Sequence, residues 1–253
     1  LGSAYFMEFY SPSFGVTTGN FGAYVSLDGG LSWTPSPEEM SAFSFADDLT
    51  GLGVASTGLH RSTDGGLTFT LVEAGAADAV AFLQAAVAVA IVDQNFVRST
   101  DGGLTWTAGT GAEGRNGLLA VSAEVVLAWG RAGTYPDYDD RVFRSTDAGA
   151  TWTDIGEVIP ADPFAAPFAF ALPAASTVVA SDGAGNLHRS TDAGASWAQV
   201  FATPGPRPGF LSGGAPVFAD PQTGYFAFGA GFVIRSTDGG ASWSQISSGS
   251  GAA

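Results

Sequence analysis

The sequence contains no cysteine and no lysine, and it is poor in charge. Without cysteine, neither a disulfide nor a thiolate metal site can form. All nine basic residues are arginine, and the formal net charge at pH 7 is −15. So acidic a chain lacks the basic stripe that binding to a phosphate backbone requires, and we expect no nucleic-acid partner.

Charged residues make up only 13% of the chain, against ~25% in an average protein. We therefore expect a surface dominated by Ser, Thr, Ala and Gly, as in secreted or surface-packed proteins. This favours a secreted, cell-surface or periplasmic location. The chain begins at Leu1 rather than at a methionine, which would fit the removal of a leader peptide.

Long hydrophobic runs are absent too. No apolar run approaches the ~20 residues that a membrane-spanning helix needs. The nearest one, residues 79–92, contains Gln84 and many β-branched residues, so two strands describe it better than one helix. We expect no membrane span.

One short pattern, by contrast, occurs six times. It reads Ser-x-Asp-(Gly/Ala)-Gly-x-(Ser/Thr)-(Trp/Phe), and the copies lie within residues 25–33, 61–69, 98–106, 144–152, 189–197 and 235–243. The repeated carboxylates are Asp28, Asp64, Asp101, Asp147, Asp192 and Asp238. The closing aromatic residues are Trp33, Phe69, Trp106, Trp152, Trp197 and Trp243. Apolar, β-branched residues precede each copy and a short strand-like run follows, which predicts a turn between two antiparallel strands.

Each position of the pattern has a physical interpretation. A short carboxylate such as Asp101 can accept hydrogen bonds from the backbone N–H groups that follow it, and so brace the turn. The first small residue is alanine at Ala148 and Ala193, so that position tolerates a Cβ. The second is glycine in all six copies, which predicts a positive φ there. The closing residue is once a phenylalanine, so a flat apolar side chain matters more than an indole N–H.

The copies resemble the Asp-box, or BNR, repeat of sialidases, sortilin-type receptors, two-propeller xyloglucanases and the photosystem II assembly-factor family. In those families the box joins the third and fourth strands of a four-stranded propeller blade. The resemblance thus implies an all-β fold, a single β-propeller of six four-stranded antiparallel blades with one Asp-box per blade. It does not specify a function, because the same blade serves hydrolases, receptors and assembly factors.

The spacing of the boxes fits one box per blade, since a four-stranded blade needs about 40–45 residues. We expect residues 1–253 to form one propeller in which each blade is made of four strands that are consecutive in the sequence. Blades 1 and 6 would then meet by side-chain packing alone. A further blade supplied from outside this sequence would change the count. The predicted blades are residues 4–34, 41–71, 78–107, 117–155, 166–202 and 214–247.

The extra length of the chain falls in blades 4 to 6. Blade 4 is predicted to carry an inserted loop, residues 131–141, between its second and third strands, and Pro-rich connectors precede blades 5 and 6. Aromatic faces stack on sugar rings or protein side chains, and adjacent carboxylates bind hydroxyl groups or Ca²⁺. The alternative is a solvated acidic loop tip. The candidate ligand-binding residues are Arg131, Tyr135, Asp137, Tyr138, Asp139, Asp140, Arg207 and Trp129. Trp129 either forms the base of a pocket or belongs to the core.

The remaining polar residues favour structural roles. Five arginines precede the boxes at one shared position, so we expect them to stack or pair between neighbouring blades: Arg61, Arg98, Arg144, Arg189 and Arg235. His60 and His188 occupy a position that is otherwise apolar or aromatic, which favours a role on the strand surface over metal binding, and there is no third histidine to complete a zinc site. The box aspartates supply one carboxylate per turn, so we expect no cofactor, with peripheral Ca²⁺ as the one alternative.

The sequence favours a non-catalytic binding or scaffolding protein over an enzyme, with a protein or a glycan as partner and with a larger extracellular assembly as one setting. The chain lacks the Phe-Arg-Ile-Pro signature of sialidases and any nucleophile-elbow motif. The first alternative is a glycoside hydrolase, which would need two carboxylates about 5–9.5 Å apart, drawn from Asp137, Asp140 and Asp162. The second is a chaperone similar to the photosystem assembly factor. That family's binding face is arginine-rich, whereas this chain is acidic.

Overall fold

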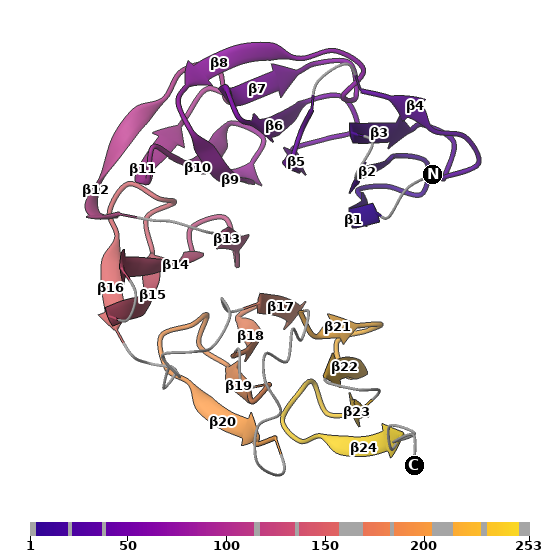
Figure 1. Cartoon of the computed structure of the whole chain (residues 1–253), viewed down its shortest axis with the longest axis vertical. Coiled ribbons are helices and arrows are strands. Elements are labelled where there is room, and N and C mark those ends of the chain that lie inside the picture. Colours follow the sequence, from indigo (N-terminus) through magenta and orange to yellow (C-terminus); the bar gives the residue numbers. More distant parts are fainter. Residues whose placement is uncertain are drawn as a thin grey trace. The chain divides into compact units, whose positions relative to one another are not determined.

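The strands of this protein form six four-stranded sheets, each built from four strands that are consecutive in the sequence (Figure 1). The structure is a computed structural model that describes residues 4–19, 22–36, 39–113, 117–134, 137–156, 169–182, 185–203, 215–228 and 232–247. No helix occurs in these ranges, and so no helix that could span a membrane. The predicted all-β fold with six four-stranded blades and one Asp-box per blade is confirmed.

The chain divides into two compact units, residues 1–126 with 145–153 and residues 127–144 with 154–253. The first unit contains three whole sheets. Their strands are β1 (Ala4–Phe9), β2 (Gly15–Gly19), β3 (Gly22–Ser26) and β4 (Thr34–Pro35); β5 (Ala42–Phe45), β6 (Gly51–Ala55), β7 (Gly58–Ser62) and β8 (Thr70–Ala74); and β9 (Ala77–Gln84), β10 (Val87–Val92), β11 (Asn95–Ser99) and β12 (Thr107–Glu113).

The fourth sheet has strands from both units, and the fifth and sixth sheets belong to the second unit. Their strands are β13 (Gly117–Ala120), β14 (Val126–Thr134), β15 (Asp137–Ser145) and β16 (Thr153–Gly156); β17 (Ala169–Ala174), β18 (Thr177–Ser181), β19 (Leu187–Ser190) and β20 (Ala198–Phe201); and β21 (Val217–Phe218), β22 (Gly224–Phe228), β23 (Phe232–Ser236) and β24 (Ser244–Ser247).

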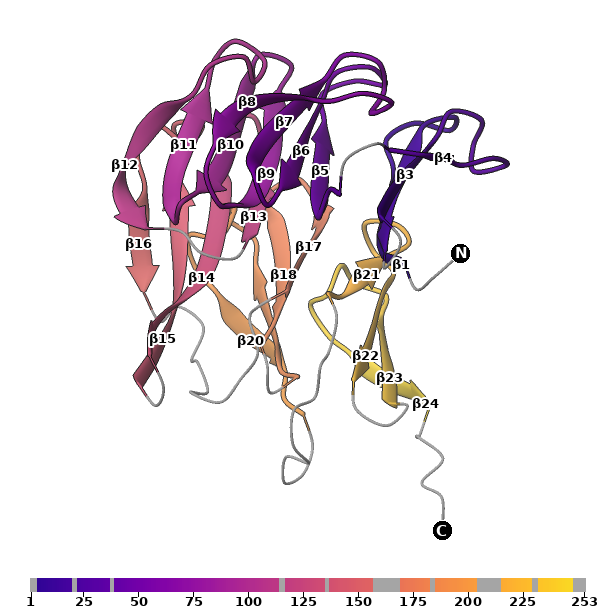
Figure 2. The same ribbon diagram turned by 45° about the horizontal axis from the view of Figure 1, so that its top comes forward.

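Burial follows the position of a strand within its sheet. The second strands β6 and β10, the latter with a Val-Ala-Val-Ala-Ile-Val run, are continuously apolar and almost wholly buried, because a sheet lies against each of their faces. The fourth strands β8 and β20 contain no fully buried residue and are more exposed. Figure 2 shows the sheets β5–β8 and β9–β12 side by side in the first unit. The side chains between them form an apolar cluster around Leu52, Val54 and Leu59.

Candidate functional site

The six Asp-box turns share one hydrogen-bond network. In the third box, Asp101 Oδ1 accepts the backbone N–H of Thr105 at 3.0 Å, and Oδ2 accepts the Thr105 hydroxyl at 2.6 Å. The buried Ser99 hydroxyl donates to Asp101 Oδ1 at 2.7 Å and accepts the N–H of Gly103 at 2.9 Å. The predicted brace is therefore confirmed. The serine two residues before the aspartate is its second half, which sequence reasoning missed although serine stands there in all six copies.

These hydrogen bonds keep the box carboxylates ionised. The hydroxyl of Ser32, followed by the backbone N–H of Ser32 and the hydroxyl of Ser26, lowers the pKa of Asp28 to about 2. The equivalent groups lower the pKa values of Asp192 and Asp238 to about 2 as well. Such carboxylates are committed to their own turns and have little capacity left for a ligand.

The two small residues of the box differ in a way that corrects the sequence interpretation. Both adopt positive φ, including Ala148 at 56° and Ala193 at 55°, so positive φ does not distinguish the second position. The two positions differ in the room that is available for a Cβ atom. A Cβ on Gly103 would lie 2.7 Å from Leu52 Cδ2 of the preceding blade, whereas a Cβ on Gly102 would meet nothing closer than a carbonyl oxygen at 3.4 Å. In blades 2 to 6 the preceding sheet approaches the second glycine closely, whereas in blade 1 a Cβ on Gly30 would meet Phe9 of the same blade at 3.1 Å.

The first small residue also fixes the box to its own blade. Its backbone N–H donates to a carbonyl of the turn between the first and second strands, at distances of 2.8–2.9 Å. The acceptor carbonyls in the six blades belong to Ser13, Leu49, Ala86, Glu124, Ser176 and Gln222. Two hairpins of each blade are therefore joined at one end of the sheet.

The arginines that precede the boxes link neighbouring blades. Arg98 Nε donates to the carbonyl of Ala148 in the next box at 2.8 Å, and Arg144 Nε donates to the carbonyl of Ala193 at 2.9 Å. Arg61 and Arg189 make the same bond to Gly102 and Gly239. The predicted pairing between blades is confirmed for these four. Arg235, the last of the set, lies over the ring of Tyr225 with Cζ 5.9 Å from the ring centroid.

The closing aromatic side chains act mainly as packing surfaces. Trp152 stacks on Phe96 of the preceding blade, with ring centroids 3.9 Å apart. Within the described part of the chain, the buried indole nitrogens of Trp106 and Trp152 have no hydrogen-bond partner. Trp197 and Trp243 donate instead to the glycine carbonyls of their own boxes at 3.1 Å. The indole N–H is thus used in some blades and left unused in others.

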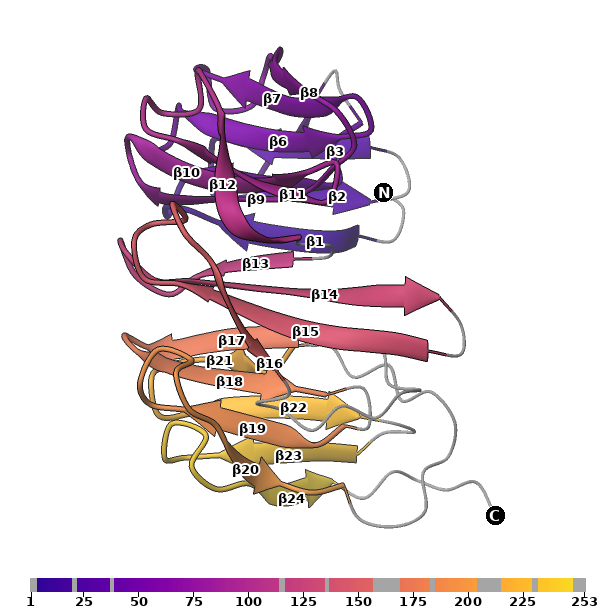
Figure 3. The same cartoon turned by 90° about the vertical axis from the view of Figure 1, so that its left-hand side faces the viewer.

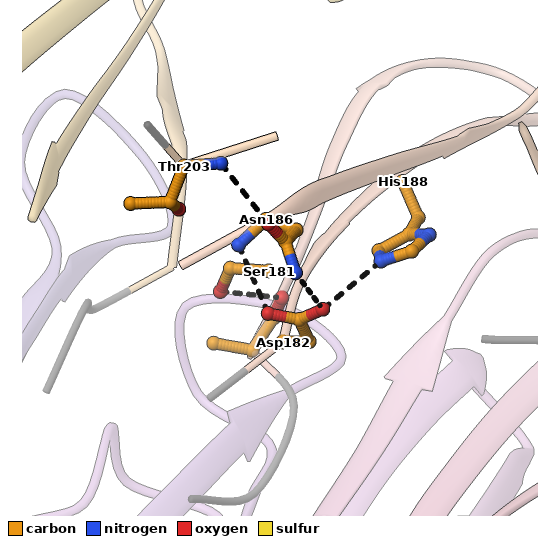
Figure 4. A network of polar contacts seen from close by, with 6 residues as sticks. Ser181, Asp182, Asn186, His188 and Thr203 are labelled. Atoms are coloured by element: carbon orange, nitrogen blue, oxygen red, sulfur yellow. Dashed lines mark hydrogen bonds and ion pairs between the residues drawn. The ribbon is translucent and has the colours of Figure 1, made fainter. Parts of the chain in front are cut away.

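The two histidines lie within β7 and β19, one residue before the arginines of their boxes, and make buried polar contacts. His188 Nε2 lies 3.2 Å from Asp182 Oδ2, and both side chains are buried. Asp182 also accepts the backbone N–H and the side-chain amide of Asn186, each at 2.9 Å, and Asn186 Oδ1 accepts the N–H of Thr203 at 3.0 Å (Figure 4). Burial raises the pKa of Asp182, but the bonds from His188 and Asn186 outweigh it and lower the pKa overall.

His60, at the same position in blade 2, lies 2.9 Å from the hydroxyl of Thr57 through Nε2. Both histidines therefore bond to the hairpin that precedes their own strand, which is a structural role. Among the described residues, no group of three or more His, Asp or Glu side chains has the geometry of a metal site.

Blade 4 does not carry the inserted loop that the sequence predicted. Residues 126–134 and 137–145 form the two nine-residue strands β14 and β15, so the added length is a longer hairpin with only 135 and 136 between the strands. In Figure 3 this hairpin is longer than the β18–β19 and β22–β23 hairpins of the same unit. The physical reason is that β14 and β15 satisfy each other's backbone groups as they extend, which a loop of this length would leave to solvent.

Most of the predicted ligand-binding side chains lie outside the described residues. Tyr135 and Arg207 are not described at all. Arg131, Asp137, Tyr138, Asp139 and Asp140 are described as backbone only, with Arg131 in β14 and the others in β15. The hairpin thus brings their backbone positions together. Trp129, half-buried in β14, packs on Phe170 of blade 5 with ring centroids 4.5 Å apart.

Solved structures with the same fold extend over nearly the whole chain. YCF48 bound to D1 peptide is 20% identical, and the match covers 97% of this chain and 82% of that one, with a TM-score of 0.65. YCF48 from Cyanidioschyzon merolae is 18% identical over 96% of this chain and 84% of its own, with a TM-score of 0.66. The chain has the fold of the Asp-box β-propellers.

A glycoside hydrolase shares that fold. The GH74 xyloglucanase from Xanthomonas campestris is 17% identical and matches 96% of this chain with a TM-score of 0.68. This chain spans 45% of the length of that enzyme. No family model matches the chain, and no curated protein matches it by sequence. At these identities the likeness shows the fold alone, and function has to be argued from the residues of this chain.

Proposed function

We propose that this chain is a non-catalytic propeller that binds a protein through the β14–β15 hairpin of blade 4 and the neighbouring connections of blades 5 and 6. The observation that carries the proposal is the hairpin itself. Its nine-residue strands are about twice as long as the five-residue strand β18 and the four-residue strand β19 of the next blade. Length beyond what the fold needs is where a rigid scaffold usually carries its binding residues.

The sequence of the hairpin fits recognition of a partner. Tyr135 and Tyr138 supply large side chains that lose little conformational entropy on binding, and tyrosine and arginine are enriched at the centre of interfaces. Three aspartates, at positions 137, 139 and 140, lie in the same strand as Tyr138, β15. An acidic, aromatic hairpin suits a partner with basic and apolar groups.

The comparisons support a protein partner as one use of this fold. One of the similar structures is YCF48 bound to D1 peptide, so a propeller with this blade type can hold a peptide. A glycan is the other partner that the tyrosines would suit, because aromatic faces stack on sugar rings. We propose a secreted, cell-surface or periplasmic location, as the low charge density suggests.

The second candidate function is glycoside hydrolysis, which the likeness to the GH74 xyloglucanase favours. It would require two carboxylates about 5–9.5 Å apart, of which one donates a proton and the other attacks or activates water. Asp137, Asp140 and Asp162 are the candidates. Replacing each by asparagine, followed by assays on β-glucans and xyloglucan, separates the two functions, since a binding protein shows no turnover in any variant.

The binding function is tested with a Tyr135→Ala/Tyr138→Ala variant. Candidate ligands are taken from a glycan array and from proteins that co-purify with the wild type, and affinity is then measured for the purified ligand. The matched control is Tyr225→Ala, which removes a tyrosine that is exposed on blade 6. We expect the double variant to lose about thirtyfold in affinity, the scale of a hot spot, without a change in melting temperature. Full affinity in the double variant would refute the proposal.

A further inference from the structure

Two leucines at one end of blades 1 and 2 depart from the pattern of the other repeats. Leu27 stands directly before Asp28, where the other five boxes have threonine. Leu49 stands in the turn between β5 and β6, where the equivalent residues are Ser13, Ala86, Glu124, Ser176 and Gln222. Both leucines are exposed, Leu27 at 53% and Leu49 at 59%. The repeat therefore tolerates polar or small residues at both positions, and blades 1 and 2 present apolar ones instead.

The two leucines come from different blades but meet at the same glycine. Leu27 Cδ2 lies 3.5 Å from the point that a Cβ on Gly65 would occupy, and the carbonyl oxygen of Asp48 lies 3.0 Å from that point. The N–H of Gly65 donates to the carbonyl of Leu49 at 2.9 Å. Leu27 and the turn that carries Leu49 therefore both lie beside Gly65, and we call the two exposed leucines the Leu27/Leu49 patch.

Hydrogen bonds within blades 1 and 2 and one between them hold the turn that carries Leu49. The Ser11 hydroxyl, in the β1–β2 turn, donates to Asp48 Oδ2 at 3.0 Å and accepts the N–H of Phe14 at 3.1 Å. Asp47 Oδ1 accepts the N–H groups of Leu49 and Thr50 at 2.8 and 2.7 Å. The turn that carries Leu49 is thus held by hydrogen bonds within the turn and by one to blade 1, so little ordering is required when a ligand binds.

Carboxylates flank the patch. Asp28 follows Leu27, and Asp47 and Asp48 precede Leu49, and all three are exposed. The N–H groups of Thr50 and Leu49 lower the pKa of Asp47, so it stays ionised at neutral pH together with Asp28. An apolar centre with an acidic rim is complementary to a segment that carries an apolar side chain between cations.

We propose that the Leu27/Leu49 patch is a docking site for a protein segment in which a leucine-like side chain is flanked by arginine or lysine. A second copy of this chain is disfavoured as the occupant, because each copy carries a formal charge of −15 and no lysine. The site lies in the first unit and uses none of the residues of the β14–β15 hairpin, so the two binding proposals stand or fall separately.

The test uses fluorescein-labelled heptapeptides as probes. One alternates arginine with leucine, a second has serine in place of each leucine, and a third has glutamate in place of each arginine. Binding is measured by fluorescence anisotropy at low and at near-physiological salt. We expect the arginine–leucine peptide to bind about tenfold more tightly than the serine peptide, and the glutamate peptide not to bind.

The decisive variant is Leu27→Thr/Leu49→Ser, which restores residues that the other repeats already carry at these positions. It should keep the melting temperature and lose about tenfold in affinity for the arginine–leucine peptide. The matched control is Leu104→Thr, which changes another exposed leucine of a box, 56% accessible, and should bind like the wild type. Equal binding of the arginine–leucine and serine peptides, or unchanged affinity in the double variant, would show nonspecific attraction to an acidic protein and overturn the proposal. A wild-type dimer in sedimentation that the double variant abolishes would overturn it as well, in favour of a second copy.

Discussion

A matched pair of glycines allows the effect of backbone conformation to be separated from that of packing. Gly102 and Gly103 are adjacent in the third box, with φ of 74° and 85°. A Cβ on Gly102 meets nothing closer than 3.4 Å, whereas a Cβ on Gly103 would meet Leu52 Cδ2 at 2.7 Å and Cδ1 at 3.1 Å. We predict that Gly102→Ala is mild and Gly103→Ala is severe, although both put alanine at positive φ.

The magnitudes follow from two separate costs. An alanine in the left-handed region costs about 1–2 kcal/mol, of which about 0.4–1 kcal/mol is regained because the unfolded chain is less free. Gly102→Ala should therefore destabilise by about 1 kcal/mol or less, in line with the alanines found at 148 and 193. Gly103→Ala carries the same cost and in addition about 1–3 kcal/mol for forcing Leu52 and the strand β6 to move. Its total is about 1–4 kcal/mol.

The assay is thermal unfolding by calorimetry, in which about 1 kcal/mol corresponds to roughly 2–4 °C for a chain of this size. Leu52→Ala provides the control, because it removes the atoms that the new Cβ would meet. In the Leu52→Ala background, Gly103→Ala should cost no more than Gly102→Ala does in the wild type, a coupling of about 1–3 kcal/mol. Equal melting temperatures for the two single glycine variants, or no coupling with Leu52→Ala, would refute the packing argument.

Three further perturbations test the polar contacts. The folded-state pKa of Asp238 is about 2, below the ordinary 3.8, so the contribution of its carboxylate to stability is present above about pH 4 and is lost as the pH falls toward 2. Asp238→Asn should therefore reduce the fall in melting temperature between about pH 4 and pH 2. The same fall in the variant as in the wild type would contradict this. Arg98→Leu leaves the carbonyl of Ala148 without its donor and should cost about 1–2 kcal/mol in calorimetry, whereas no loss would mean that the bond between the blades contributes nothing. Asp182→Ala removes the acceptor of His188 and Asn186 and should cost about 2–4 kcal/mol, with His188→Leu in the same background recovering part of it.

Much of the Asp-box turn could be predicted from the sequence, because the turn is repeated six times. The brace at Asp101 was predicted from a residue shared by six copies, and the arginine link between blades from one shared by five, since a residue that recurs at one position has a shared structural role. The length of the blade-4 segment was visible too, but its conformation was not. Residues 131–141 contain Gly133 and Pro136 and read as a loop, yet strand pairing organises all but 135 and 136.

The sequence by itself determined the blade, because its turn is held by contacts local in the chain: Ser99, Asp101, Gly103 and Thr105 satisfy one another within seven residues. Tertiary structure alone decided what is packed against that turn. The reason that Gly103 must be glycine is Leu52, about fifty residues earlier on another sheet, and the same kind of distant approach places Leu27 beside the turn of Leu49. Such contacts depend on how one sheet lies against the next, and a pattern read along a single strand carries no record of its neighbour.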